Sequence, residues 1–179
     1  IRLLAEYLKN QPRYHTFLDD ETIDLLCKSA PLHDIGKVGV SDRILLKPGR
    51  LTDQEFEEMK RHTIYGRDTI LAAERKLGNT SFLRVAREIA YTHHERWDGS
   101  GYPEGLKGEQ IPVPGRLMAL VDSYDALTSK RVYKSQIPHE KAVDIIMEER
   151  GSHFDPQVVD AFFKVKEDFR QIALKYTDV

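Results

Sequence analysis

Residues 82–103 read FLRVAREIAYTHHERWDGSGYP, an apolar helical pattern that ends in two adjacent histidines and a glycine-rich segment. Its apolar residues recur at helical spacing: Phe82, Val85, Ala86, Ile89 and Ala90. Because His93 continues this spacing, we expect its imidazole to point toward the interior. The glycines and prolines from Trp97 to Pro114 forbid regular structure. The stretch therefore predicts a helix that carries imidazoles into a core, followed by the longest loop of the chain.

Further helices are expected before this stretch. Asp20 is a candidate N-cap for a helix that Pro31 should break just before His33. The segment Thr52–Glu55, TDQE, has the form of a capping box. The helix after this box is expected to carry three residues on one face: Met59, His62 and Gly66.

The second half of the chain also favours helices. One is expected from about Arg116 to Lys130, and Pro138 begins another. A last helix should bury five apolar residues: Val158, Phe162, Val165, Phe169 and Ile172. Convincing strand alternation is absent, which leaves at most a short hairpin at 37–47 or 104–113. The predicted fold is all-α and compact, with one long Gly/Pro-rich loop.

Length and composition set the class of protein. The chain has 179 residues, of which 40% are hydrophobic and 31% charged, as expected for one globular domain. A formal net charge of −2 argues against a DNA-binding or membrane-binding surface. Cys27 is the only cysteine; we place it in the core and expect a reducing, cytoplasmic compartment. No apolar run could span a bilayer. Because the chain begins at Ile1 within a helical pattern, we expect a fragment of a longer protein.

Six residues form a candidate ligand set for metal ions: His33, Asp34, His62, His93, His94 and Asp122. Imidazoles and carboxylates suit iron, manganese, nickel and zinc. Adjacent helical residues point about 100° apart, so the pairs His33-Asp34 and His93-His94 would serve two ions more easily than one, with Asp34 bridging. In two-metal sites a bound water becomes hydroxide near neutral pH and attacks phosphorus in an in-line displacement.

The alternative for each residue taken alone is an ordinary structural role. A lone buried histidine such as His62 is more often a hydrogen-bonded core residue than a ligand. A carboxylate such as Asp122 in an apolar helix is costly without a partner, which favours the ligand role. The remaining histidines lack such context and are interpreted as surface or capping residues: His15, His139 and His153.

Three longer segments resemble the HD-GYP domain, a subgroup of the HD phosphohydrolase superfamily. They are HDIGKVGVSDRILLKPGRLTDQEFEEMKRH (33–62), HHERWDGSGYPEGLKGEQIP (93–112) and GRLMALVDSYDALTSKRVYK (115–134). The resemblance covers nearly the whole chain and assigns residues 1–179 to one HD-type domain. It implies an all-α fold, two or three divalent ions with iron or manganese favoured over nickel or zinc, and hydrolysis of cyclic di-GMP to linear pGpG, GMP or both.

The resemblance also assigns roles to individual residues. The six candidate ligands match the family's metal ligands, with Asp34 as the bridging carboxylate. Lys37 matches the lysine of the HDxGK motif, which implies contact with the scissile phosphate and a catalytic role beside Asp34. Arg131 and Lys134 match positions that hold the phosphates of the substrate. Two further residues complete the candidate substrate site: Tyr102 and Asp125.

Several readings of the function stay open. The substrate could be a cyclic GMP-AMP or a linear dinucleotide in place of cyclic di-GMP. A di-iron oxygenase is a rival, although the cluster of Lys37, Arg131 and Lys134 suits phosphate better. A non-catalytic module could sense cyclic di-GMP or dock onto a diguanylate cyclase through the loop Gly101-Tyr102-Pro103.

The resemblance leaves the assembly open as well. It implies an upstream receiver or other sensory domain, and a homodimer is a further candidate. Some members of the family carry an additional ligand in a helix before the HD motif. The matching positions precede Ile1, so the sequence leaves open a binuclear or a trinuclear centre.

Overall fold

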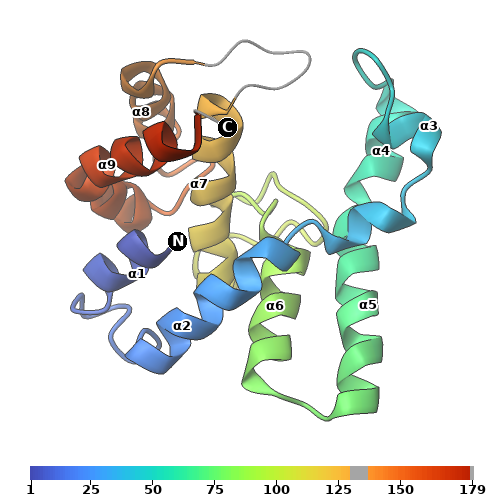
Figure 1. The fold of residues 1–179 in the computed structure, drawn as a ribbon, viewed down its shortest axis with the longest axis horizontal. Coiled ribbons are helices and arrows are strands. Elements are labelled where there is room, and N and C mark those ends of the chain that lie inside the picture. The colour runs from blue at the N-terminus through green and yellow to red at the C-terminus, as the bar shows by residue number, and fades with distance from the viewer. Residues whose placement is uncertain (130–136, 178–179) are drawn as a thin grey trace.

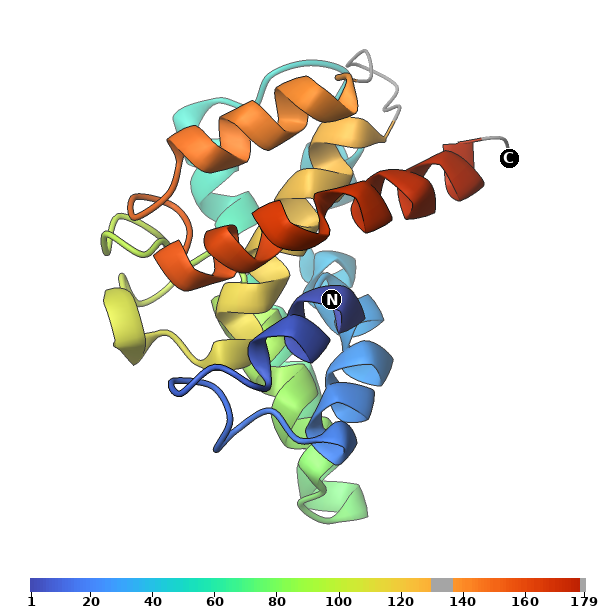
Figure 2. The same ribbon diagram turned by 90° about the vertical axis from the view of Figure 1, so that its left-hand side faces the viewer.

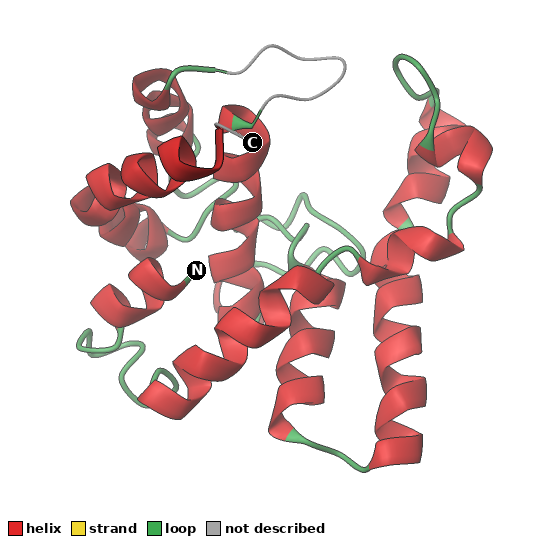
Figure 3. Cartoon of the chain, in the orientation of Figure 1, coloured by secondary structure: helices red, strands yellow, loops and turns green. Residues whose placement is uncertain are grey.

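The computed structural model describes residues 1–129 and 137–177, and this part of the chain is helical with no β-strand (Figures 1 and 3). A single isolated bridge joins Arg150 to Phe154. The predicted all-α fold is therefore confirmed. Neither candidate hairpin forms within the described residues. Residues 37–47 contain part of one 3-10 helix and a short α-helix, and residues 104–113 contain another 3-10 helix.

The helices are joined by turns and loops, with a long loop between residues 92 and 108. The α-helices are α1 (Arg2–Leu8), α2 (Asp20–Ser29), α3 (Asp42–Leu45), α4 (Asp53–Lys60), α5 (His62–Leu77), α6 (Ser81–Thr92), α7 (Val113–Thr128), α8 (His139–Glu148) and α9 (Pro156–Thr177). Three 3-10 helices join them: η1 (Ala30–Leu32), η2 (Ile35–Gly39) and η3 (Gly108–Gln110).

Two apolar clusters hold these helices together. The larger cluster surrounds α7 and includes Leu117, Leu120 and Phe162, all fully buried. A smaller cluster of Ile70, Ala86 and Ala90 joins α5 to α6. In Figure 1, α1, α8 and α9 lie on one side of α7, and α3, α4 and α5 lie on the other. Figure 2 shows α1 and α9 together on the face that is seen there. No helix among the described residues is long and apolar enough to cross a membrane.

Several helix boundaries differ from those expected. Asp19, one residue before Asp20, is the N-cap of α2, because its carboxylate accepts a hydrogen bond from the backbone N–H of Thr22. As predicted, α2 ends before Pro31, and Thr52 begins α4 with a capping box. The single helix expected to carry Met59, His62 and Gly66 is two helices in the structure, because the chain turns at Arg61, whose N–H bonds to Glu58 at 3-10 spacing.

The later helices show two further differences. Helix α7 begins at Val113, before the expected start, because a proline fits the first turn of a helix where its missing N–H has no partner. Ile172 is 45% exposed and is not part of the core. It lies toward the end of α9, which projects past the other helices (Figure 2). The other four apolar residues predicted for this helix are at least partly buried.

Candidate metal centre

Four parts of the fold deliver the six predicted donor side chains to one place. His33 and Asp34 lie between η1 and η2, where the chain turns after Pro31 has ended α2. His62 is the first residue of α5. His93 is the C-cap of α6, and His94 follows it. Asp122 comes from the middle of α7. The arrangement matches the prediction that these residues lie together.

A close backbone contact positions Asp34 beside His62. A methyl group added at Gly36 would lie 1.9 Å from the carbonyl oxygen of His62 and 2.3 Å from the backbone nitrogen of Gly66. Only glycine therefore allows η2 to approach α5 this closely. Because Gly36 follows Asp34 by two residues, this contact sets the distance between the carboxylate and the imidazole.

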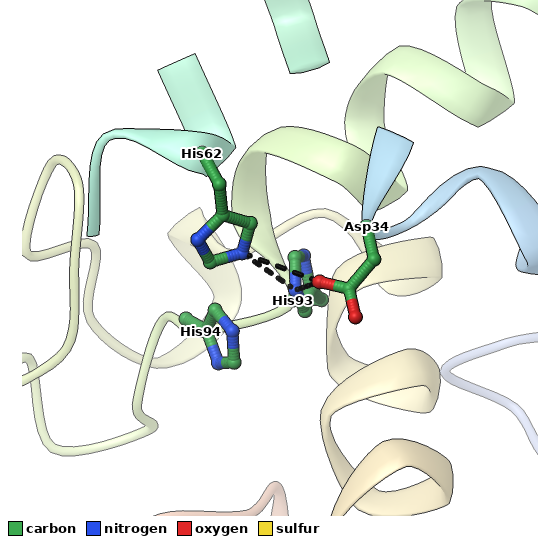
Figure 4. A group of neighbouring side chains, drawn as sticks. All are labelled: Asp34, His62, His93 and His94. Carbon is green, nitrogen blue, oxygen red and sulfur yellow. Dashed lines mark hydrogen bonds and ion pairs between the residues drawn. The ribbon is translucent and has the colours of Figure 1, made fainter. Parts of the chain in front are cut away.

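One oxygen of Asp34 faces a group of imidazoles, as Figure 4 shows. Its Oδ1 lies 3.5 Å from Nε2 of His62 and 3.9 Å from Nε2 of His93. The two Nε2 atoms are 3.5 Å apart. With His94, these residues place one donor atom each within 4.8 Å of one another. This group has one carboxylate oxygen and three imidazole nitrogens.

The other oxygen of Asp34 faces a second group. Nε2 of His33 lies 3.3 Å from Oδ2 of Asp34 and 3.6 Å from Oδ1 of Asp122. Nζ of Lys37 lies 2.5 Å from the same Oδ2 of Asp34. The Asp34 carboxylate therefore stands between two groups of donors, with one oxygen turned toward each.

Backbone carbonyls fix the orientation of three imidazoles. Nδ1 of His33 lies 2.8 Å from the carbonyl oxygen of Ala30. The same contact joins His62 to Met59 at 2.7 Å and His93 to Ile89 at 3.0 Å. Since a carbonyl oxygen only accepts, Nδ1 must donate its hydrogen. The lone pair of each neutral ring then lies on Nε2, which faces the cluster, an arrangement common for metal-ligating histidines.

The pKa shifts follow from burial and from the crowding of these groups. Burial and neighbouring imidazoles lower the pKa of His93 to about 4 and the pKa of His94 to about 2, so both rings are neutral at pH 7. Burial favours a lower pKa for His33 too, but the carboxylates of Asp122 and Asp34 outweigh it and raise the pKa to about 10. Burial favours a higher pKa for Asp34, yet His33 and Lys37 hold it well below its ordinary value.

The donor set fits a divalent cation. Oδ1 of Asp34 is buried and has no hydrogen-bond partner, an unfavourable state for a carboxylate oxygen unless a cation binds it. Two ligands about 2.1 Å from one ion lie roughly 3.0–3.5 Å apart. The separations between the Asp34 oxygens and the histidine Nε2 atoms, 3.3 to 3.9 Å, are close to this range. Within the described part of the chain, these residues could therefore hold one ion or two.

Tyr102 lies beside this centre. Its ring is tilted by 31° over the ring of His94, with 4.9 Å between the centroids. Burial, with the charges of Asp34 and Asp122, raises the pKa of its hydroxyl above the ordinary value. Tyr102 is thus neutral and half-buried, as a residue lining a substrate site would be.

Glu95 organises the loop that carries Tyr102 and was not predicted from the sequence. It is 1% exposed, and its two carboxylate oxygens accept hydrogen bonds from the backbone N–H groups of Glu104 at 2.8 Å and Leu106 at 2.9 Å. Its position directly after His93-His94 was the available signal. From sequence alone, a glutamate at this position is expected to be exposed to solvent, because only the folded loop shows that it is buried.

The other predicted residues have different positions. Asp125 is exposed one turn beyond Asp122 and accepts a hydrogen bond from Ser129. Arg131 and Lys134 lie outside the described residues. The surface or capping role expected for His139 is wrong, because its side chain is 10% exposed and its Nδ1 contacts the hydroxyl of Tyr124 at 2.8 Å. Cys27 is half-buried against the larger core.

Comparisons with known proteins give the family and the fold. A family model described as an HD domain matches residues 14–158. A cyclic di-GMP phosphodiesterase of Vibrio cholerae serotype O1 is 57% identical over 178 residues, which cover 99% of this chain and 36% of that protein. The 3′3′-cGAMP-specific phosphodiesterase 2 of the same organism is 40% identical over 178 residues, 99% of this chain and 33% of that protein. The chain thus spans about a third of the length of these two relatives.

A solved structure resembles the fold. Bd1817, an HDG"Y"P protein from Bdellovibrio bacteriovorus, matches with a TM-score of 0.61 at 18% sequence identity. The match covers 94% of this chain and 49% of that chain. At this level of identity the likeness supports the helical fold alone.

Proposed function

The chain belongs to the HD domain family, and from this membership and the geometry of the site we propose that it hydrolyses cyclic di-GMP with the help of divalent metal ions. The family predicted from the three sequence segments is confirmed. One observation carries the proposal. The Asp34 carboxylate stands between two groups of donors, and its Oδ1 is buried without a hydrogen-bond partner.

The two donor groups suit two ions. We assign Asp34, His62, His93 and His94 to one ion, and His33, Asp34 and Asp122 to the other. Imidazole and carboxylate ligands suit iron, manganese, nickel and zinc alike, and the resemblance to HD-GYP domains favours iron or manganese among them. Such ions act as Lewis acids on a phosphoryl oxygen, and they lower the pKa of a bound water to near neutral. The second group offers fewer ligands, which leaves room for water, substrate or a further protein ligand.

The protein groups around the centre bind and orient the phosphodiester. Lys37 is 39% exposed at its side chain and lies at the Asp34 carboxylate, where it can donate a hydrogen bond to a phosphate oxygen and offset the charge that grows during the reaction. Hydrolysis forms a bond from a water oxygen to phosphorus and breaks the bond from phosphorus to the 3′ oxygen, which takes up a proton. The product of one such step is linear pGpG, and a second step gives GMP.

Further residues complete the proposed substrate site. Tyr102 lines it beside His94. Arg131 and Lys134 are proposed to hold the second phosphate, as charge-assisted hydrogen bonds would allow. Asp125, exposed on α7, is proposed to contact the substrate from the side of that helix.

The decisive experiment compares the wild type with Asp34→Ala after anaerobic purification. Metal is counted, and turnover of cyclic di-GMP is followed by separating the linear product. We expect about two ions per chain in the wild type, and loss of both metal and turnover in the variant, with the helical circular dichroism retained. Two ions without turnover of any cyclic dinucleotide would refute the hydrolase and favour a sensor of cyclic di-GMP.

A cyclic GMP-AMP is the second candidate substrate, because one relative that is 40% identical bears the name of a 3′3′-cGAMP-specific phosphodiesterase. Competition between the two cyclic dinucleotides and linear pGpG in one reaction separates these activities by their kcat/KM ratios. A di-iron oxygenase is disfavoured by Lys37 at the centre. Oxygen consumption by the iron-loaded protein tests that alternative directly.

We also propose partners for this chain. An upstream receiver domain is proposed from the resemblance. A homodimer is a further candidate, and a diguanylate cyclase bound through Gly101-Tyr102-Pro103 belongs to the alternative of a docking module. Because the Tyr102 ring packs on His94, a docked partner would contact the loop mainly through its exposed outer residues. A pull-down of the cyclase in which Tyr102→Ala leaves partner binding untouched would weaken the proposal of docking through this loop.

A further inference from the structure

Helix α4 brings two side chains to Tyr102 that belong to neither donor group. The ring of Phe56 meets the ring of Tyr102 edge to face, with 6.4 Å between centroids and 82° between planes. Nζ of Lys60 lies 5.0 Å from the centroid of Phe56 and 5.5 Å from that of Tyr102. Phe56 and Lys60 lie four residues apart on α4, so both point to the same side of the helix.

These contacts extend the metal centre outward. His94 packs against Tyr102, and Tyr102 packs against Phe56. The three rings therefore form a continuous path from the donor cluster to the surface at α4. A substrate whose phosphate lies at Asp34 would have its nearest aromatic surface along this path.

Phe56 is available to a ligand. It remains 46% exposed, although folding usually covers much of a large aromatic ring. Tyr102 meets the ring at its edge or face and Lys60 lies over it, so a base would stack on the part of the ring face that remains exposed. Purine bases stack on such faces whatever their sequence context.

Lys60 adds polarity to this aromatic surface. Its ammonium group is paired with Glu57 at 2.6 Å, and its side chain is 28% exposed. A lysine ammonium only donates hydrogen bonds. Guanine presents two acceptors, N7 and O6, on one edge, whereas adenine presents N7 and the N6 amino donor there. A lysine at this position therefore favours guanine over adenine.

We propose that Phe56 and Lys60 form the seat for one guanine base of the substrate, with the base stacked on Phe56 and its N7/O6 edge facing Lys60. This inference rests on the proposed hydrolysis of a cyclic dinucleotide at the same site. It adds a base-binding element on α4 that determines specificity, distinct from the residues that hold metal or phosphate.

The test uses three variants of the protein. Phe56→Leu keeps apolar volume but removes the π-face, and Lys60→Met keeps the aliphatic stem but removes the charge. Gln54→Ala, at an exposed position on the same helix, is the matched control. Metal content and thermal stability of each variant are measured first. Initial rates with cyclic di-GMP then give kcat and KM, and cyclic di-AMP is tested as a competitive inhibitor to give its Ki.

We expect Phe56→Leu to raise the KM for cyclic di-GMP about tenfold, the scale of one lost base–aromatic stack, while kcat and metal content stay near the wild-type values. Lys60→Met should raise the same KM but leave the Ki of cyclic di-AMP nearly unchanged, so that the preference for guanine falls about tenfold. Gln54→Ala should match the wild type in every measurement.

Two outcomes would refute the base seat on α4 but leave the proposed hydrolysis intact. In the first, wild-type protein hydrolyses cyclic di-GMP, yet Phe56→Leu and Lys60→Met retain its KM. In the second, the variants lose metal or stability together with activity, which would show a purely structural role. A wild type that binds metal but hydrolyses no cyclic dinucleotide would instead refute the proposed function, and the base seat with it.

Discussion

Lys37 lies at the proposed metal centre, but its side chain offers no atom that could bind a cation. Its Nζ lies 2.5 Å from Oδ2 of Asp34, but a protonated ammonium has no lone pair for a cation. Lys37→Met should therefore keep the metal content and lower kcat by about 10²- to 10³-fold, the scale of one lost donor to a developing negative charge. Metal analysis and initial rates check this, with Lys37→Arg expected to recover part of the rate. Loss of metal in parallel with activity would contradict the assignment.

The pKa shifts of the buried histidines determine how the stability of the metal-free protein depends on pH. Burial lowers the pKa of His62, His93 and His94 below the ordinary 6.5. Below pH 6.5 the unfolded chain therefore binds protons that the folded chain refuses, and the free energy of unfolding falls with decreasing pH. His33 acts in the opposite sense, since its pKa is raised to about 10 and its contribution is lost as the pH rises from 6.5 through 10.

The metal-free protein should therefore be most stable near pH 6.5. Urea unfolding in the presence of a chelator, at intervals from pH 4.5 to 10, measures this directly. His94→Ala removes one of the groups with a lowered pKa and should flatten the acid side of the curve. A stability that rises steadily from pH 6.5 to pH 5 would contradict the assignment of neutral, buried imidazoles.

Sequence patterns predict the positions of some site residues and fail to predict the environments of others. The six candidate donors, which the structure brings together, could be recognised because most of them lie in short local motifs. Glu95 and His139 could not, because their environments depend on distant parts of the chain. The Glu95 carboxylate accepts hydrogen bonds from Glu104 and Leu106, which lie nine and eleven positions later in a loop that folds back. His139 is buried against Tyr124 of another helix.

At the level of elements, the contact between η2 and α5 depends on Gly36. A methyl group there would meet backbone atoms of His62 and Gly66, which cannot rotate away as a side chain can. We expect Gly36→Ala to cost about 1–3 kcal/mol in the free energy of unfolding, and to weaken metal binding because Asp34 moves with η2. Val38→Ala, at an 82% exposed position of the same 3-10 helix, should change stability by less than about 0.5 kcal/mol. Equal stability for the two variants by urea unfolding would contradict this account.

The long loop after α6 depends on Glu95 in a similar way. Glu95→Ala leaves the N–H groups of Glu104 and Leu106 without their acceptor, at a cost of about 1–3 kcal/mol for each N–H that stays buried. The loop should become sensitive to limited proteolysis, while His93 and His94 at the end of α6 should still support metal binding. Glu95→Gln, which keeps one acceptor oxygen, should show an intermediate rate of cleavage. Unchanged protection in Glu95→Ala would show that packing alone holds the loop.

Element boundaries show where local patterns suffice. Pro31 and the Thr52 capping box act within one turn of helix, and both boundaries were predicted from them. The break at Arg61 was not, because Met59, His62 and Gly66 fit an uninterrupted helical face. That face is interrupted at Arg61, whose N–H bonds to Glu58 at 3-10 spacing.

At the scale of the whole molecule, the candidate metal centre collects residues from helices of both apolar clusters, which meet at α6. Asp122 comes from α7 in the larger cluster, and His62 comes from α5, which the smaller cluster joins to α6. Asp34 reaches both sides. An ion bound by these residues would therefore link α7 to α5.

Metal binding should then stabilise the entire fold. Free metal at about 1,000 times its Kd adds about 4 kcal/mol through mass action when the unfolded chain does not bind it. For a chain of this length that corresponds to a rise in Tm of about 10 °C. Calorimetry with and without a chelator measures the shift, and Asp34→Asn, which removes the bridging charge, should abolish most of it. If two ions bind per chain and the Tm does not move, the unfolded chain binds the ions as tightly as the folded chain does, which would contradict a site that only the fold assembles.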